Sequence, residues 1–144
     1  MRNKQYQAAG GVVVHEGHIL LLDRPNRGEV RLPKGHIESN EAADEAALRE
    51  VVEESGYCDL EILADLGNQV VEFDYAGAHY VRDEHYFLLA LQSDQQVPRN
   101  KKDAGQFQVI WVPFAHAEEQ LTYAAEQAVV RKAVQAYERL SEQQ

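Results

Sequence analysis

The sequence predicts one α/β domain in which a mixed β-sheet lies between two helical layers. The chain has 144 residues, about the length of a single domain, so residues 1–144 are treated as one unit. Two segments, one before the middle of the chain and one near its end, carry apolar residues at helical spacing. Short apolar runs flank the first segment and separate it from the second. The order is therefore two strands, a helix, three strands and a helix, and each helix needs a sheet face to cover its apolar stripe.

The N-terminal part is predicted to form a β-hairpin followed by a loop. Residues 8–15 and 19–22 are apolar runs, and residues 16–17 form a tight turn between them. The two strands alternate only weakly, which is typical of strands that are buried on both faces. Residues 23–29 are rich in turn formers, and residues 30–33 form a short extended piece because a proline disfavours helix at the residue before it.

The first helix is expected to begin after Ser39 or Asn40, either of which can cap its N-terminus. Its buried stripe includes Ala43, Ala47 and Val51, and these small side chains allow a close approach to the sheet. Gly56 follows the last periodic residue and is the expected C-terminal stop.

The C-terminal part is predicted to contain three more strands and the second helix. We expect Thr122 to cap that helix. The predicted elements are strands at 70–75, 79–91 and 108–114, the first two forming a hairpin about residues 76–78, a loop at 92–105, a helical turn at 115–120 and a helix at 123–140. Residues 59–66 alternate loosely and are compatible with a further strand.

Composition excludes several classes of protein. The formal net charge is −10, from 24 acidic against 14 basic residues, which argues against long nucleic acid as a partner but leaves room for a small polyphosphate. No apolar run reaches the roughly 18 residues that span a bilayer, and no secretory stretch follows the N-terminus, so we expect a cytoplasmic protein. The lone Cys58 excludes an internal disulfide and a multi-cysteine zinc site, and we expect it to be a half-buried apolar residue. The sequence does not distinguish a monomer from a homodimer.

Three carboxylates of the first helix share one face. Glu50, Glu53 and Glu54 stand at positions i, i+3 and i+4, where like charges repel and destabilise a helix. A divalent cation such as Mg²⁺ takes oxygen ligands and would remove this repulsion. Taken alone, such a cluster is more often a solvated helix face. Its wider context favours a metal site.

That context resembles the signature of the Nudix hydrolase family, G-x5-E-x7-R-E-U-x-E-E-x-G-U, in which U is a bulky aliphatic residue. Tyr57 replaces the last aliphatic residue and is the one departure. The positions that match are Gly35, Glu41, Arg49, Glu50, Val51, Glu53, Glu54 and Gly56. We call residues 35–57 the signature segment. The resemblance implies a Nudix-type α/β/α sandwich and the hydrolysis of a nucleoside diphosphate linked to another group, with Mg²⁺, or Mn²⁺ as a substitute, as cofactor.

The resemblance also implies roles for individual residues. Arg49 would pair with Glu41 and hold the loop against the helix, and the backbone carbonyl of Gly35 would be a metal ligand. Glu50 and Glu54 can hold one metal between successive helical turns, and Glu53 can bind a second ion or accept the proton of the attacking water. The expected metal ligands are therefore Gly35, Glu50, Glu53 and Glu54, and the expected catalytic residues are Glu53, Glu54, Glu50, Arg49 and Glu41.

Many members of the family carry a glutamate in the loop before the tryptophan-containing strand, where it can act as the base. The nearest residues here are Asp103 and Gln106, ahead of Trp111. Glu53 is therefore the favoured base and Asp103 the second candidate. Glu38 is left open between a metal contact and an exposed loop residue, and Trp111 is expected to anchor the core.

The substrate is predicted from weaker signals. Residues 32–38, L-P-K-G-H-I-E, resemble the L-P-K-G-H-x-E of asymmetrical dinucleoside tetraphosphatases, as do residues 111–114 and 121–123. Diadenosine tetraphosphate is therefore the favoured substrate. The alternatives are a diphosphoinositol polyphosphate or a (d)NTP, and a nucleotide-binding module that does not hydrolyse its ligand.

Six side chains are predicted to contact the substrate. Cations of the loop would reach phosphate, and Tyr123 would stack on adenine. For the cations, including the nearby Arg27, the alternative is an ordinary solvated loop. For Tyr86, as for Tyr75 and Tyr80, the alternative is packing within the sheet. The predicted contacts are Arg24, Arg31, Lys34, His36, Tyr86 and Tyr123.

Overall fold

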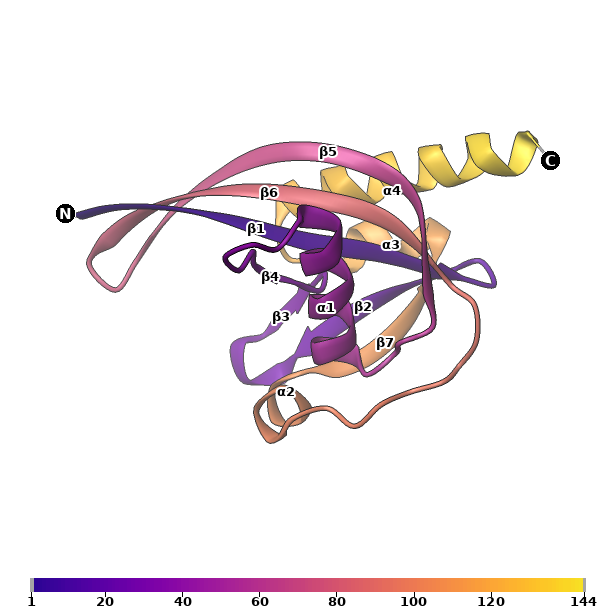
Figure 1. The fold of residues 1–144 in the computed structure, drawn as a ribbon, viewed down its shortest axis with the longest axis horizontal. Coiled ribbons are helices and arrows are strands. Elements are labelled where there is room, and N and C mark those ends of the chain that lie inside the picture. The colour runs from indigo at the N-terminus through magenta and orange to yellow at the C-terminus, as the bar shows by residue number, and fades with distance from the viewer. Residues whose placement is uncertain (1, 144) are drawn as a thin grey trace.

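A computed structural model describes residues 2–143 and contains a curled mixed sheet with a helical layer on each side (Figure 1). The sheet runs in the order β3-β2-β1-β6-β5, while β4 pairs with β1 and β7 pairs with β2. Its strands are β1 (Arg2–His15), β2 (His18–Arg24), β3 (Glu29–Arg31), β4 (Lys34–His36), β5 (Leu60–Tyr75), β6 (Ala78–Leu91) and β7 (Gln108–Pro113). The predicted α/β sandwich is confirmed.

Each face of the sheet is covered by helices from a different part of the chain. Helix α1 (Ala43–Ser55) packs on one face, and α3 (Phe114–Gln120) and α4 (Ala124–Glu142) pack on the other. Successive β1 residues point to opposite faces. Accordingly, Val13 packs in the α1 layer and Val12 in the α4 layer. The weak alternation of this strand reflects burial on both sides.

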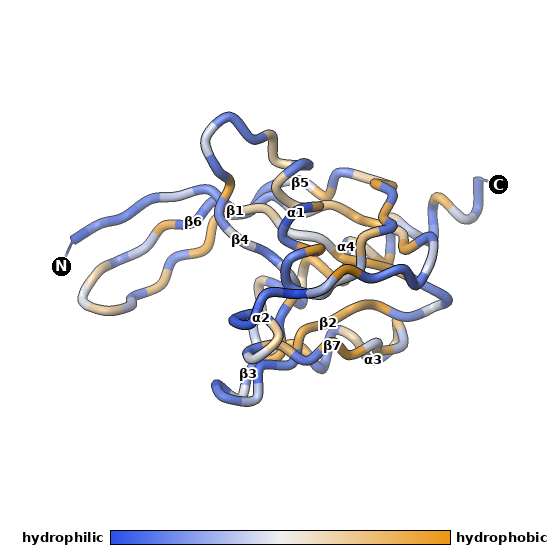
Figure 2. Tube along the Cα trace, turned by 60° about the horizontal axis from the view of Figure 1, so that its bottom comes forward, coloured by the Kyte–Doolittle hydropathy of each residue, from blue (hydrophilic) through white to orange (hydrophobic). Residues whose placement is uncertain are grey.

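Three long strands extend beyond the helical layers as a twisted ribbon. Strand β1 pairs in parallel with β6 from Arg2↔Ala78 to Val14↔Ala90, and β5 pairs with β6 in antiparallel fashion. The turn of the β5–β6 hairpin and the start of β1 project together from the body of the domain (Figures 1 and 2). We call this projecting part of β1, β5 and β6 the ribbon.

The first helix ends where the sequence predicts but begins later. Gly56 has a φ of +85° and its N–H bonds to the carbonyl of Val52, which makes it the predicted C-terminal stop. The N-cap is Ala42, so the prediction of Ser39 or Asn40 is wrong. Residues 38–41 form a turn in which Asn40 has a φ of +65° and the carboxylate of Glu41 accepts the N–H of Glu38. This turn delays the helix.

Three other local predictions are wrong. Residues 59–66 and 70–75 belong to one strand, β5, which continues through two register irregularities. The expected loop at 92–105 contains the start of α2 (Lys101–Gln106), where the side chain of Asn100 accepts the N–H of Asp103. Thr122 does not cap α4, because its hydroxyl accepts the N–H of Val30.

A close contact between β1 and β4 sets the position of the signature segment. Ala9 pairs with Gly35, Gly10 pairs with Lys34, and the N–H of Gly11 donates to the carbonyl of Pro33 at 3.1 Å. A Cβ atom on Gly10 would lie 2.5 Å from that carbonyl oxygen. Only glycine therefore allows residues 33–35 to lie this close to the centre of the sheet.

Two further observations concern Cys58 and the helices of the described residues. Cys58 is half-buried, as expected. Within residues 2–143, no helix is both long enough and apolar enough to cross a membrane.

Replacement of Gly10 by alanine should destabilise the fold by about 1–3 kcal/mol, because the new methyl group overlaps backbone that cannot easily move. Urea unfolding measures this change. Gly105→Ala is the matched control, since a Cβ there meets nothing within 4 Å and alanine favours the helix. Equal stability of the two variants would contradict the close contact.

Candidate active site

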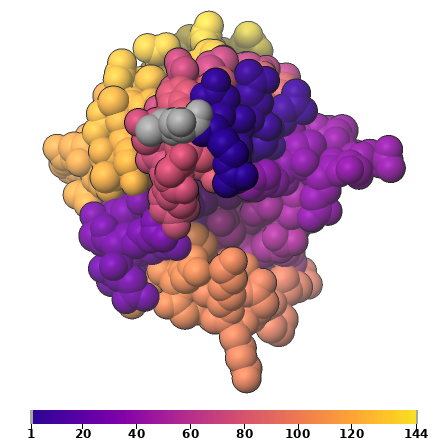
Figure 3. All heavy atoms as spheres, turned by 90° about the vertical axis from the view of Figure 1, so that its left-hand side faces the viewer, coloured from indigo at the N-terminus to yellow at the C-terminus, as the bar shows by residue number. Residues whose placement is uncertain are grey.

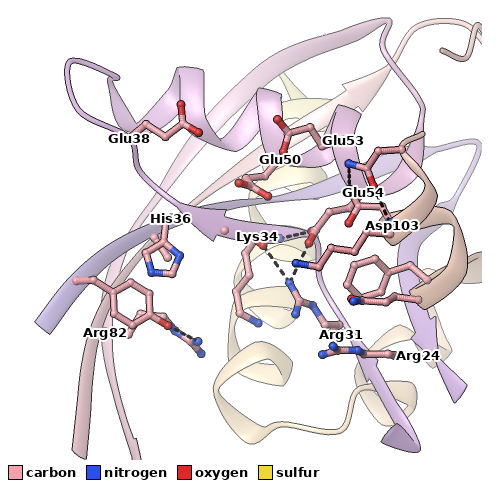
Figure 4. A pocket seen from close by; sticks show the side chains of 17 residues that line it. Arg24, Arg31, Lys34, His36, Glu38, Glu50, Glu53, Glu54, Arg82 and Asp103 are labelled. Carbon is pink, nitrogen blue, oxygen red and sulfur yellow. Dashed lines mark hydrogen bonds and ion pairs between the residues drawn. The ribbon is translucent and has the colours of Figure 1, made fainter. Parts of the chain in front are cut away.

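A cleft of about 460 Å³ lies where α1, α2, β4 and the ribbon meet. Figure 3 shows this face of the molecule, hollowed between the ribbon, the segments on either side of it and α2. Carboxylates of α1 lie along one side of the cleft and guanidinium groups lie across from them (Figure 4). The cleft therefore has negative charge on one wall, which suits a metal ion, and positive charge on the other, which suits an anionic ligand bridged by that metal.

Arg49 joins the helix to the loop before it. Its Nε and Nη2 donate to the two carboxylate oxygens of Glu41 at 2.7 and 3.0 Å, and Nη2 also donates to the carbonyl of His36 at 2.9 Å. The Arg49 hydrogen bonds lower the pKa of Glu41 to about 2. The predicted pair is therefore present, and it fixes the turn between β4 and α1.

Glu50 lies against the backbone of Gly35. A Cβ atom on Gly35 would lie 2.2 Å from the carboxylate carbon of Glu50. Burial is the main cause of the raised pKa of Glu50, although Arg49 Nη1 donates to its Oε1 at 2.8 Å. The glycine of the signature thus makes a cradle that the carboxylate fills.

Glu54 is the most enclosed of the three carboxylates, with 7% of its surface exposed. Its Oε1 accepts the backbone N–H of Lys34 at 2.9 Å, and its Oε2 accepts from Nη2 of Arg31 at 3.3 Å. Burial nevertheless raises its pKa to about 7. These two contacts do not fully offset the desolvation of the charge.

The donor set suits a hard divalent cation. Among residues 2–143, no three His, Cys, Asp or Glu side chains already converge at metal-binding geometry. Glu50, Glu53 and Glu54 do face the same cleft and offer only oxygen, and two of them have raised pKa values. A cation would supply the positive charge that these two groups lack. The residues present therefore fit Mg²⁺ or Mn²⁺.

Glu53 is more accessible than its two neighbours. Its side chain is 45% exposed, and Nη1 of Arg49 donates to its oxygens at 3.2 and 3.3 Å. Asp103 and Gln106 of α2 also line the cleft, and the amide of Asn100 donates to Asp103 at 2.9 Å. Both candidate bases are thus at the site, and Gln106 adds no carboxylate. Glu38 lines the same cleft.

Five of the six predicted substrate contacts, all but Tyr86, border the cleft or the cavity beside it. Arg24 and Arg31 lie over the ring of Phe107 at 5.6 and 5.1 Å from its centroid, which holds them at the cleft. His36 also lines the cleft. Tyr123 lines an adjoining cavity of about 470 Å³ instead, and the two cavities share Arg24, Arg31, Lys34 and Arg82.

Lys34 lines both cavities, but its charge already has a partner within the protein, so its phosphate contact stays a prediction. It is 8% exposed, and its ammonium donates to the buried carboxylate of Glu126 in α4. The other oxygen of Glu126 accepts the N–H of Leu32 at 2.7 Å. Burial also lowers the pKa of Lys34. With its charge already paired, Lys34 fixes the chain beside the cleft.

Tyr86 is not at the surface of the cleft, so its predicted contact with substrate is corrected. Its side chain is 1% exposed and packs in the α4 layer of the core, beneath Gly10. A period-two strand pattern shows which residues share a face but not how far the core extends along that face.

Several residues at the cleft escaped the sequence analysis. Arg82 and Tyr6 come from the ribbon, and Phe107 follows α2. Glu126 opens α4 and lines the adjoining cavity. The chain that separates them from the signature segment ranges from about 25 to 70 residues, so no local spacing could reveal them. The charged residues Arg82, Asp83 and Glu84 within a predicted strand were the available signal.

Comparison with known proteins agrees with this geometry. The sequence pattern of the NUDIX domain family matches residues 5–134. The chain belongs to this family. The signature segment is accordingly its Nudix box.

Named relatives fall into more than one group. A Mycobacterium tuberculosis protein named MutT4 is 30% identical over 97% of this chain and 59% of its own length. An 8-oxo-(d)GTP phosphatase of Mycolicibacterium smegmatis is 26% identical over 87% of this chain and 37% of its own length. The chain thus spans between about a third and three fifths of these relatives. An Ap4A hydrolase of C. elegans, a solved structure, is 25% identical with a TM-score of 0.63, over 88% of this chain and 94% of that one.

Replacement of Gly35 by alanine should push the Glu50 carboxylate out of its cradle and weaken Mn²⁺ binding by about 10- to 100-fold. Paramagnetic resonance titration with Mn²⁺ measures this loss. The fold should keep its stability within about 1 kcal/mol, because the group that must move is the flexible end of a side chain. Unchanged Mn²⁺ affinity would refute the cradle.

The metal-free protein should become less stable as the pH rises. The pKa of Glu54 is raised from 4.5 to about 7, so its contribution is fully present below pH 4.5 and is lost as the pH passes 7. The free energy of unfolding should therefore fall by up to about 3 kcal/mol from this group. Urea unfolding in EDTA at pH 5 and pH 8 tests this, and Glu54→Gln should flatten the difference. The same difference in both proteins would show that Glu54 is not its source.

Proposed function

We propose that this chain is a metal-dependent hydrolase that cleaves a phosphoanhydride bond of a nucleoside polyphosphate by attack of water at phosphorus. The observation that carries the proposal is the convergence of the half-buried Glu50 and the buried Glu54 on one cleft with Arg24 and Arg31 across from them. Such a cleft accepts a polyphosphate whose charge is shared between a cation and guanidinium groups.

The Nudix box supplies the residues that would hold the metal. Glu50, Glu54 and the carbonyl of Gly35 would be its ligands, and Glu53 would bind a second ion or remain free. When bound, Mg²⁺ or Mn²⁺ neutralises charge on phosphate oxygens and makes a water more acidic. Arg49 holds Glu41 and the carbonyl of His36, so the loop that carries Gly35 keeps its place.

Glu53 is the proposed general base. Its greater exposure lets a water reach it, and its contact with Arg49 orients it along the cleft. Asp103 is the second candidate because it enters the same cleft from α2. The two residues belong to different helices, so separate substitutions distinguish them.

The favoured substrate is diadenosine tetraphosphate. Tyr123 is 47% exposed and lines the cavity that adjoins the cleft, where an adenine can stack on it. The likeness of the chain to an Ap4A hydrolase supports this choice, as do residues 32–38.

A (d)NTP is the second candidate, favoured by the likeness to an 8-oxo-(d)GTP phosphatase. A diphosphoinositol polyphosphate fits less well because four of the five lysine and arginine side chains that line the cleft, all but Lys102, already have carboxylate partners. The pairs are Arg24–Glu29, Arg31–Glu54, Lys34–Glu126 and Arg82–Glu84. Little free positive charge remains for a denser polyanion. A cytoplasmic location and a monomeric or homodimeric state stay predictions.

Release of phosphate or nucleotide should be measured on a panel of diadenosine polyphosphates, dNTPs, a diphosphoinositol polyphosphate, ADP-ribose and NADH. Turnover should require Mg²⁺ or Mn²⁺ and stop with EDTA, and kcat/KM should be highest for diadenosine tetraphosphate. Nucleotide binding without any turnover would show a non-catalytic module. A higher kcat/KM for a dNTP would identify a dNTP as the substrate and leave the proposed reaction unchanged.

The same assay identifies the base. Glu53→Gln should lower kcat by about 10²- to 10⁴-fold, whereas Asp103→Asn should change it by less than about tenfold. The opposite order would assign the base to Asp103.

A further inference from the structure

Four aromatic rings of the ribbon and the ring of His36 in β4 gather around a third cavity, of about 460 Å³. The strand register brings them together: Tyr80 of β6 lies beside Lys4 of β1 and opposite Phe73 of β5. We call this group the aromatic platform. It consists of Tyr6, His36, Phe73, Tyr75 and Tyr80.

The rings contact one another but leave their outer side open. Phe73 and Tyr80 are stacked with centroids 5.1 Å apart, and Tyr6 and His36 are stacked at 4.1 Å. Tyr75 lies tilted to Tyr80 at 6.5 Å and is 56% exposed. Cross-strand pairing accounts for Phe73 and Tyr80, which are direct neighbours. It does not account for an exposed Tyr75.

Positive charge borders the platform. The ammonium of Lys4 lies 5.6 Å from the ring centroid of Tyr80. The guanidinium of Arg82 lies 4.9 Å from that of Phe73 and 6.0 Å from that of Tyr6. Aromatic rings bordered by cations favour a flat, electron-rich ring that carries phosphate, and a nucleotide has this chemistry.

The platform is continuous with the candidate active site. Tyr6 and His36 line both its cavity and the catalytic cleft, and His36 follows Gly35 directly. Phe73 and Tyr75 line both its cavity and the one that contains Tyr123. A polyphosphate in the cleft therefore has two aromatic sites beside it, one at Tyr123 and one on the ribbon.

We propose that the aromatic platform binds the second base of a dinucleoside polyphosphate, while the first base lies against Tyr123. This inference rests on the proposed function and adds to it a preference for substrates with two bases. Tyr80 is the residue to test, because it lines the platform cavity and neither of the other two described cavities.

The experiment compares diadenosine tetraphosphate with adenosine tetraphosphate, which has the same number of phosphates and one base. Dissociation constants are measured by calorimetry in Ca²⁺, and KM is measured in Mg²⁺. The wild type should bind the two-base ligand about tenfold more tightly, as expected for one stacked base. Tyr80→Leu should bring this ratio close to one, and Tyr80→Phe should keep it.

Val70→Ala is the matched control, since Val70 is an exposed β5 residue that borders none of the three cavities. It should keep the wild-type ratio.

Equal binding of the two ligands by the wild type would overturn the inference, whether or not either is hydrolysed. An unchanged ratio in Tyr80→Leu would also overturn the inference. If the substitution changes the oligomeric state and leaves the ratio unchanged, a second copy of the chain covers the platform. Loss of turnover alone, with the ratio kept, would overturn the proposed function and leave the platform standing.

Discussion

Two buried carboxylates from opposite helical layers bind the same short stretch of chain, and the candidate site depends on both of these contacts. Glu54 of α1 accepts the N–H of Lys34, while Glu126 of α4 accepts the N–H of Leu32 and the ammonium of Lys34. Because buried charges need partners, neither helix can shift without leaving one of them unpaired. The segment that ends at Gly35 is thereby fixed relative to both layers.

At the cleft, the negative charges of the carboxylates are partly balanced by neighbouring guanidinium groups, although the protein as a whole is acidic. Around the cleft, carboxylates of α1 face guanidinium groups on the opposite side, and Arg49 alone contacts Glu41, Glu50 and Glu53. Glu50 and Glu54 still have raised pKa values, because burial outweighs these contacts. The remaining imbalance is what a divalent cation would correct, which explains how three neighbouring glutamates can be tolerated on one helix.

The sequence predicted local structure well where a short-range rule decides it. The β1–β2 hairpin and the end of α1 at Gly56 follow from turn chemistry, and the pairing of Arg49 with Glu41 is what the family resemblance implies. It failed where side chains bond to distant backbone instead of to their own helix. Thr122 is a suitable cap by type, yet its hydroxyl bonds to Val30, which lies 92 residues away in the chain.

By itself, the sequence determined the family, the α/β sandwich and the carboxylates of the Nudix box, since these depend on residue types at short, regular spacings. The tertiary structure alone decided which other groups meet them. Strand pairing placed Tyr80 beside Lys4 and removed Tyr86 into the core, and packing of α4 buried Lys34 against Glu126. The physical reason is that burial and charge pairing depend on neighbours in space, which a linear pattern does not record.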